Sequence, residues 1–214
     1  MNMKKYVPKT EVKPYKEDFA KIMKSIRPTI KQQGITFTYN LVGSAKRNLV
    51  IRYPNKGFDC DYQIFIQKNK KNLKPKELKL MFITEINKVL KALFPKYDNC
   101  EDKTTAITIK KKNQENSSIE FSFDIVIMKI EKNQTKIIRK NDETNEYNFE
   151  LLKDMKITQN LIKQIKHQQM WDEVRKKYYN EKMKKLNNEN KKSFQILNEV
   201  LSKVIQKLPK EKLI

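Results

Sequence analysis

Two aspartates one residue apart, Asp59 and Asp61, stand at the head of an apolar run within residues 41–66. Residues i and i+2 of a strand point to the same face, so the two carboxylates are expected side by side. Neighbouring carboxylates repel each other, and each raises the pKa of the other. A divalent cation relieves that repulsion, and hard oxygen ligands favour Mg²⁺.

A glycine–serine pair, Gly43 and Ser44, lies upstream at the end of a predicted strand over 35–43. Glycine lets the backbone approach a phosphate, and the amides and hydroxyl of a Gly-Ser turn that opens a helix form an anion cradle. Two of the three glycines of the chain, Gly43 and Gly57, lie in this segment. The pattern therefore predicts a phosphate site next to a metal site.

The order of Gly43, Ser44, a gap, and then Asp59 and Asp61 before apolar residues resembles the nucleotidyltransferases of the DNA polymerase β type. The likeness is nearest to the branch that holds the bacterial cyclic-oligonucleotide synthases and the oligoadenylate synthetases. It implies a third carboxylate on a later, adjacent strand, and Asp124 in IEFSFDIVIMKI fits that place. The gap from Ser44 to Asp59 is longer than the family pattern, which suggests an insertion at 52–56.

The resemblance implies an α+β fold, with a nucleotidyltransferase-type mixed β-sheet flanked by helices and a C-terminal helical segment. It also implies a metal-dependent enzyme that transfers a nucleoside monophosphate from ATP or another nucleoside triphosphate to a hydroxyl group, with release of pyrophosphate. Asp59, Asp61 and Asp124 would be its catalytic residues and would bind two Mg²⁺ or Mn²⁺ ions. One ion would help to hold the triphosphate, and the other would activate the attacking hydroxyl.

The nucleotide-binding residues implied by the resemblance are Gly43, Ser44, Lys46 and Arg47. The two basic residues would lie in the first turns of a short helix after Gly43 and Ser44, close to the triphosphate. They could equally be two more solvent-exposed basic side chains in a basic protein, and the sequence does not decide between these interpretations.

The acceptor is open at this point. A second nucleotide would give an oligonucleotide signal, an RNA end would suit the basic charge, and a protein or a small molecule is a third option. A hypothesis of another class is a non-catalytic nucleic-acid-binding or partner-binding protein that reuses the fold. A basic structural protein is a further alternative, although the placed glycines argue against it.

The 214 residues include 47 basic and 25 acidic side chains, which gives a net charge of +22. Such a charge favours polyanionic partners and predicts RNA binding. Only five of the basic residues are arginine, and the chain is rich in asparagine and isoleucine. This skew is typical of an AT-rich genome, so part of the charge is background rather than a sign of recognition. Two cysteines are too few for a disulfide framework or a zinc site. The polar N-terminus and the lack of a long apolar run predict a cytoplasmic protein with no membrane partner.

The pattern along the chain predicts an N-terminal arm without periodicity (1–16), a core of strands and helices (17–150) and a C-terminal helical region packed on that core (151–214). The resemblance implies that residues 17–150 are the nucleotidyltransferase core. Pro8 and Pro14 favour the extended arm, and a helix is expected over 17–33. Further strands are expected at 58–67, 104–112, 118–131 and 135–139, followed by an irregular acidic loop. Further helices are expected from Pro75 to just before Pro95 and over 157–167, 171–185 and 193–208.

Overall fold

The computed structural model of the protein describes residues 6–52, 57–152, 156–184 and 193–207. The chain divides into two compact units, residues 1–152 and residues 153–214. The insertion suggested at 52–56 lies outside the described residues except for its first residue. Among the helices that the structure describes, none combines the length and the apolar character that crossing a membrane requires.

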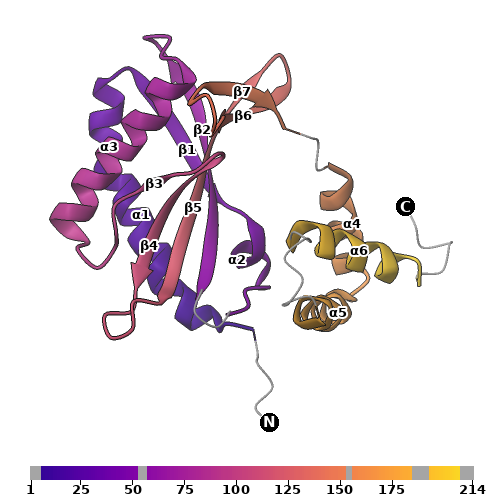
Figure 1. The fold of residues 1–214 in the computed structure, drawn as a ribbon. Helices are drawn as coiled ribbons and strands as arrows, with labels where there is room; N and C mark the ends of the chain where they lie inside the picture. The colour runs from indigo at the N-terminus through magenta and orange to yellow at the C-terminus, as the bar shows by residue number, and fades with distance from the viewer. Residues whose placement is uncertain (1–5, 53–56, 153–155, 185–192, 208–214) are drawn as a thin grey trace. The chain divides into compact units, whose positions relative to one another are not determined.

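The described part of the first unit contains a seven-stranded mixed sheet (Figure 1). Its strands are β1 (Ile35–Leu41), β2 (Phe58–Asn69), β3 (Glu101–Asp102), β4 (Ala106–Lys112), β5 (Ile119–Glu131), β6 (Gln134–Lys140) and β7 (Tyr147–Leu151). They run in the order β1-β2-β5-β4-β3, with β6 on the end of β5 and β7 on β6. Strands β2 and β5 are parallel, and the other pairs are antiparallel. The predicted α+β class is confirmed.

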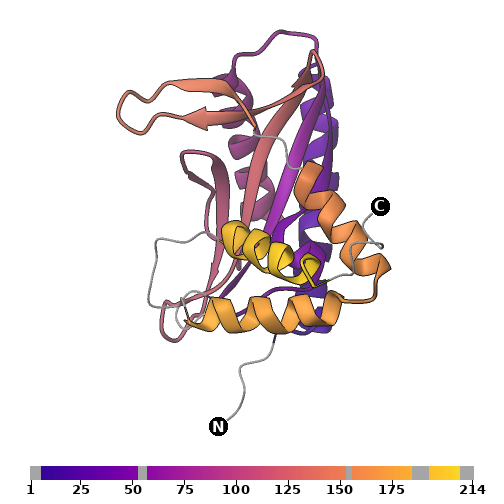
Figure 2. The ribbon, with the colours of Figure 1, turned by 90° about the vertical axis from the view of Figure 1, so that its right-hand side faces the viewer.

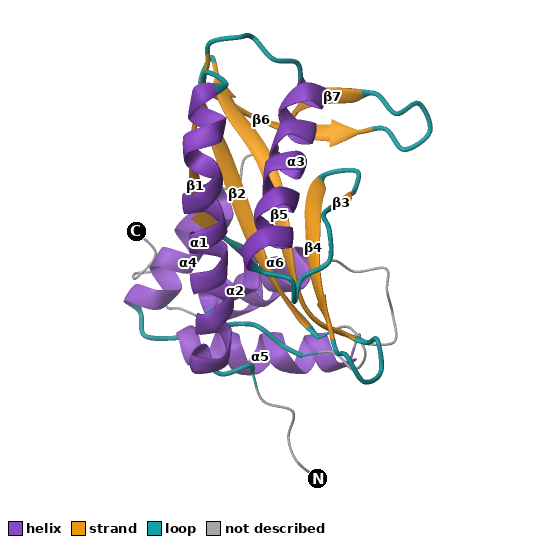
Figure 3. Ribbon diagram, turned by 90° about the vertical axis from the view of Figure 1, so that its left-hand side faces the viewer, coloured by secondary structure: helices purple, strands orange, loops and turns teal. Residues whose placement is uncertain are grey.

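Two long helices, α1 (Lys9–Gln32) and α3 (Pro75–Leu93), cover one face of this sheet (Figure 3). The core lies between them and the strands, because alternate strand residues turn their apolar side chains to the helices. The ring of Phe19 in α1 stacks on Tyr62 in β2 at 3.5 Å between centroids, and Phe37 meets Phe82 edge-on at 5.1 Å. This face of the sheet is therefore closed by packing.

Helix α1 begins at Lys9, so the predicted arm over 1–16 and the helix start at residue 17 are wrong for residues 9–16. Tyr15 is half-buried and lies one turn before Phe19, and Val12 is buried in the core and lies two turns before it. Both residues continue the apolar stripe of Phe19 toward the N-terminus. Both Pro14 and Pro28 lie inside the helix. Burial of this stripe outweighs the backbone hydrogen bond that each proline removes.

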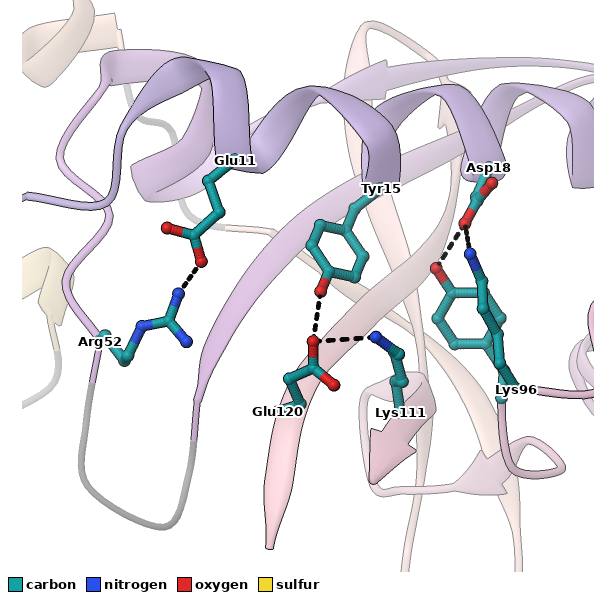
Figure 4. Close-up of polar contacts among 8 residues, drawn as sticks. Glu11, Tyr15, Asp18, Arg52, Lys96, Lys111 and Glu120 are labelled. Carbon is teal, nitrogen blue, oxygen red and sulfur yellow. Dashed lines mark hydrogen bonds and ion pairs between the residues drawn. The ribbon is translucent and has the colours of Figure 1, made fainter. Parts of the chain in front are cut away.

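Polar contacts hold α1 against the connections and strands beside it (Figure 4). Near its N-terminus, Glu11 forms an ion pair with Arg52. Further along the helix, the buried Asp18 accepts a hydrogen bond from the Tyr97 hydroxyl at 2.8 Å and pairs with the Lys96 ammonium at 2.7 Å. Burial and the Asp18 carboxylate raise the pKa of Tyr97 well above its ordinary range. The buried carboxylate is therefore compensated from two sides, as a buried charge requires.

A third contact joins α1 to the start of β5. The Tyr15 hydroxyl donates to the Glu120 carboxylate at 3.0 Å, and the Lys111 ammonium donates to the same oxygen at 2.8 Å. The lysine holds the pKa of Glu120 below its usual value. The register of α1 on the sheet thus depends on ionic contacts as well as on apolar packing.

Two strands of the structure, β3 and β7, were not predicted from the sequence. Strand β3 has only two residues, and β7 falls in the segment that was expected to be an irregular acidic loop. In β7, Tyr147 and Phe149 alternate with exposed residues, and the Tyr147 hydroxyl bonds to Asp102. Figure 2 shows β6 and β7 as a hairpin that extends away from the rest of the sheet.

The described part of the second unit contains three helices, α4 (Lys156–His167), α5 (Trp171–Lys184) and α6 (Ser193–Ile205). The three predicted helices are confirmed, although α6 ends three residues before the predicted boundary. Helix α6 contacts both α4 and α5. The buried apolar side chains of the three helices are Ile165, Val174, Tyr178, Ile196, Leu197, Val200, Leu201 and Val204. The packing of this unit on the core stays a prediction.

Replacement of Tyr97 by phenylalanine tests the contribution of the buried contact with Asp18. The change removes a hydrogen bond to a buried charge, so we expect the free energy of unfolding to fall by about 1.5–3 kcal/mol. The thermal midpoint should then fall by roughly 4–10 °C. The matched control is Tyr39→Phe, in a half-buried tyrosine of β1, and equal midpoints for the two variants would contradict this assignment.

Candidate metal centre

Asp59, Asp61 and Asp124 come together on the sheet face opposite α1 and α3. Asp61 of β2 lies directly beside Asp124 of β5 in the parallel register, and Asp59 lies beside Ser122. One carboxylate oxygen from each aspartate lies within 4.8 Å of the other two. Cys60 lies between the two aspartates of β2, and Phe123 lies next to Asp124 in β5. Both are fully buried on the helix-covered face. The predicted alternation therefore places all three carboxylates together.

The three carboxylates repel one another. Partial burial, followed by the charges of Asp59 and Asp124, raises the pKa of Asp61 from 3.8 to about 7. The guanidinium of Arg47 and a hydrogen bond from the Ser44 backbone oppose this rise. A divalent cation removes the repulsion, and three carboxylates at this spacing are the hard oxygen donors that Mg²⁺ or Mn²⁺ binds. The residues present fit the metal that the sequence predicts.

The turn at Gly43 lies directly against Asp61. Helix α2 (Gly43–Arg47) begins here, and Gly43 has a φ of +63°. A Cβ atom on Gly43 would lie 1.8 Å from Oδ2 of Asp61, so the carboxylate would have to move. The Val42 amide also donates to the Asp61 carbonyl at 2.8 Å. Glycine at this position lets the turn adopt its positive φ and leaves the Asp61 carboxylate in place.

The two basic residues of α2 differ in their surroundings. The Arg47 guanidinium donates to the Gly43 carbonyl at 2.8 Å and lowers the pKa of Asp61, so it supports the turn and the carboxylate. Lys46 is exposed. The contact of either side chain with a triphosphate stays a prediction.

Thr108 of β4 is part of the site, and the sequence analysis missed it. Its hydroxyl donates to Oδ1 of Asp124 at 2.6 Å, and its Cα lies opposite Asp124 in the antiparallel register. The only signal in the sequence is a polar residue between Ile107 and Ile109. Its partner becomes known only when the register of β4 on β5 is known.

Cys60 lies between two of the carboxylates in the sequence but points away from them into the core. Burial, then the neighbouring Asp59, raises the pKa of its thiol to about 12. The thiol is therefore protonated and faces away from the proposed metal site.

Replacement of Gly43 by alanine tests the contact between the turn and Asp61. The new Cβ must displace the carboxylate, so we expect Mn²⁺ affinity, measured by titration calorimetry, to fall about tenfold or more. The matched control is Gly34→Ala, because Gly34 also has a positive φ (+80°) but its Cβ would approach only Lys70 and Lys71. An equal loss of Mn²⁺ affinity in both variants would show that backbone strain, and not Asp61, is responsible.

The raised pKa of Asp61 predicts a pH-dependent stability in the absence of metal. The folded chain keeps this proton up to about pH 7, whereas the unfolded chain loses it near 3.8, so stability falls as the pH rises through this window. In a chelator, we expect Asp61→Asn to raise the free energy of unfolding by roughly 2 kcal/mol at pH 8 and by almost nothing at pH 4. Denaturant melts at both pH values measure this, and a less stable variant at pH 8 would refute it.

Comparison with protein-family models gave no match, and comparison with curated proteins gave none either. Solved structures do match. GTP-bound DncV of Vibrio cholerae is 13% identical with a TM-score of 0.60, over 91% of this chain and 52% of that chain. The CdnE cyclic dinucleotide synthase of Elizabethkingia meningoseptica is 13% identical with a TM-score of 0.55, over 93% and 70%. The Bradyrhizobium diazoefficiens CD-NTase CdnG is 14% identical with a TM-score of 0.53, over 75% and 44%.

At these identities the likeness establishes the fold. This chain spans about half the length of the DncV chain that it matches. The resemblance expected from the Gly-Ser turn and the aspartates is confirmed at the level of the fold. The chain has the nucleotidyltransferase fold of bacterial cyclic dinucleotide synthases.

Proposed function

We propose that this chain is a metal-dependent nucleotidyltransferase that transfers a nucleoside monophosphate from a nucleoside triphosphate to a hydroxyl acceptor. The observation that carries the proposal is the convergence of Asp59, Asp61 and Asp124 on one sheet face, within 4.8 Å of one another. A group of acidic side chains alone would be weak support. Here Gly43 leaves space for Asp61, and the fold is that of proteins solved with GTP bound.

In this proposal, Asp59, Asp61 and Asp124 hold two Mg²⁺ or Mn²⁺ ions. The ions, when bound, neutralise phosphate charge and lower the pKa of the acceptor hydroxyl. The backbone at Gly43 and Ser44 orients the triphosphate, with Lys46 and Arg47 nearby. The acceptor oxygen forms a bond to the α-phosphorus while the bond to the β-phosphate oxygen breaks. Pyrophosphate leaves, and the hydroxyl proton passes to solvent.

A second nucleotide is the acceptor that the comparisons favour. The CdnE structure is titled a cyclic dinucleotide synthase with GTP and Apcpp. A DncV structure with a TM-score of 0.56 holds the linear intermediate pppA(3′,5′)pG. An RNA end is the second candidate, and the net charge of +22 favours it.

A transfer assay separates these options. The protein is incubated with each α-labelled nucleoside triphosphate and Mg²⁺ or Mn²⁺, with and without RNA, beside Asp59→Ala. We expect label in a small, phosphatase-resistant product that forms without RNA and is lost in the variant. Label on RNA would make the chain a terminal nucleotidyltransferase. Equal and negligible transfer by both proteins would favour a non-catalytic binding protein that reuses the fold.

Loss of Asp124 should impair chemistry more than nucleotide binding, because the family resemblance implies that the third carboxylate binds the ion nearer the acceptor. We expect Asp124→Ala to lower the transfer rate by roughly 10³-fold or more, while the Kd for the nucleoside triphosphate rises less than about tenfold. Asp98→Ala is the control, since Asp98 pairs with Lys112 outside the triad. Equal loss of nucleotide binding in Asp124→Ala and Asp61→Ala would count against this division of roles.

A further inference from the structure

Thr108 has a fixed place beside the third carboxylate. Its Cα lies opposite Asp124 of β5 on one side and opposite Glu101 of β3 on the other. Its neighbours Ile107 and Ile109 are fully buried on the helix-covered face. A slip of β4 by one residue would turn both isoleucines to the other face, so burial holds Thr108 in register with Asp124.

The hydrogen bond between these two side chains is short and sheltered. The Thr108 hydroxyl donates to Oδ1 of Asp124 at 2.6 Å, and Thr108 is only 8% exposed. Threonine has few χ1 rotamers, so its hydroxyl points in a defined direction. A hydroxyl bonded to a carboxylate makes one of the stronger hydrogen bonds in proteins. The bond therefore fixes the plane of a carboxylate that would otherwise rotate about its terminal torsion.

We propose that Thr108 is a positioning residue that holds the Asp124 carboxylate in the orientation in which the three aspartates bind a divalent cation. The inference rests on the proposed function, because it assumes that the triad binds metal. Groups that orient metal ligands commonly change metal affinity by about 10- to 100-fold when removed. Asp59 and Asp61 share one strand, whereas Asp124 comes from another, so its orientation depends on contacts made by β5 and β4.

A purely structural role for the bond predicts a different result. In a purely structural role, the Thr108 hydroxyl donates to Asp124 only because a buried donor needs an acceptor. Its removal would then lower the stability of the protein and leave its metal affinity unchanged. If it positions Asp124, removal weakens metal binding in the folded protein. A change that keeps the hydroxyl restores binding in the second case.

Titration calorimetry of the full chain with Mn²⁺ alone distinguishes the two roles. The proteins are wild type, Thr108→Val, Thr108→Ser, Asp124→Asn and, as a matched control, Thr38→Val in an exposed threonine of β1. We expect Thr108→Val to raise the Kd for Mn²⁺ about tenfold or more. Thr108→Ser and Thr38→Val should stay within about threefold of wild type.

Nucleotidyl transfer provides the second readout. We expect the Mn²⁺ concentration for half-maximal transfer to rise in Thr108→Val by the same factor as the Kd, while the rate at saturating Mn²⁺ stays within about threefold of wild type. Thermal unfolding in a chelator checks that each variant is folded. Thr108→Ala replaces Thr108→Val if valine is not tolerated.

Two failures are distinguishable. If Asp124→Asn loses Mn²⁺ and Thr108→Val binds it like wild type, the positioning role is overturned and the metal site stands. If wild type does not bind Mn²⁺, or Asp124→Asn binds it equally well, the metal site itself is wrong and the role of Thr108 fails with it.

Discussion

The mutual repulsion of three carboxylates on two hydrogen-bonded strands is the constraint on which this structure depends. Backbone pairing places Asp61 beside Asp124 and prevents the strands from moving apart to relieve the charge. The fully buried Cys60 and Phe123 anchor the same strands to the core. Burial of Asp61, and then its repulsion by Asp59 and Asp124, raise the pKa of this carboxyl. An arrangement that lowers stability without metal is typical of a site kept for function.

Much of this arrangement follows from the sequence because it is local. Alternation along β2 and β5 predicts which side chains face the core, and a Gly-Ser pair after an apolar strand predicts the turn. The start of α1 was mispredicted because Pro8 and Pro14 were given more weight than the apolar spacing of Val12 and Tyr15. Strand β7 carries only a short local signal, the alternation of Tyr147 and Phe149 with exposed residues, and the polar, acidic residues before it favour a loop. The role of Thr108 has no local signal, because a single sequence does not give the register between strands.

The net charge of the chain says less about a nucleic-acid partner than its magnitude suggests. Near the third carboxylate, the ammonium groups of Lys103 and Lys110 both bind Glu101, at 2.7 and 2.5 Å. Lys79 is buried and pairs with Asp102 at 2.7 Å. These lysines hold loops and strands of the fold in place. Part of the net charge of +22 therefore serves the fold and is not evidence for an RNA partner.

The most direct test of the central claim is a crystal structure of the chain with Mn²⁺ and a nucleoside triphosphate analogue that cannot be transferred, with anomalous scattering used to locate the metal. We expect anomalous peaks within coordination distance of oxygens from Asp59, Asp61 and Asp124, with the triphosphate at Gly43 and Ser44. Peaks at other residues, or an Asp124 carboxylate that turns away from the metal, would contradict the central claim.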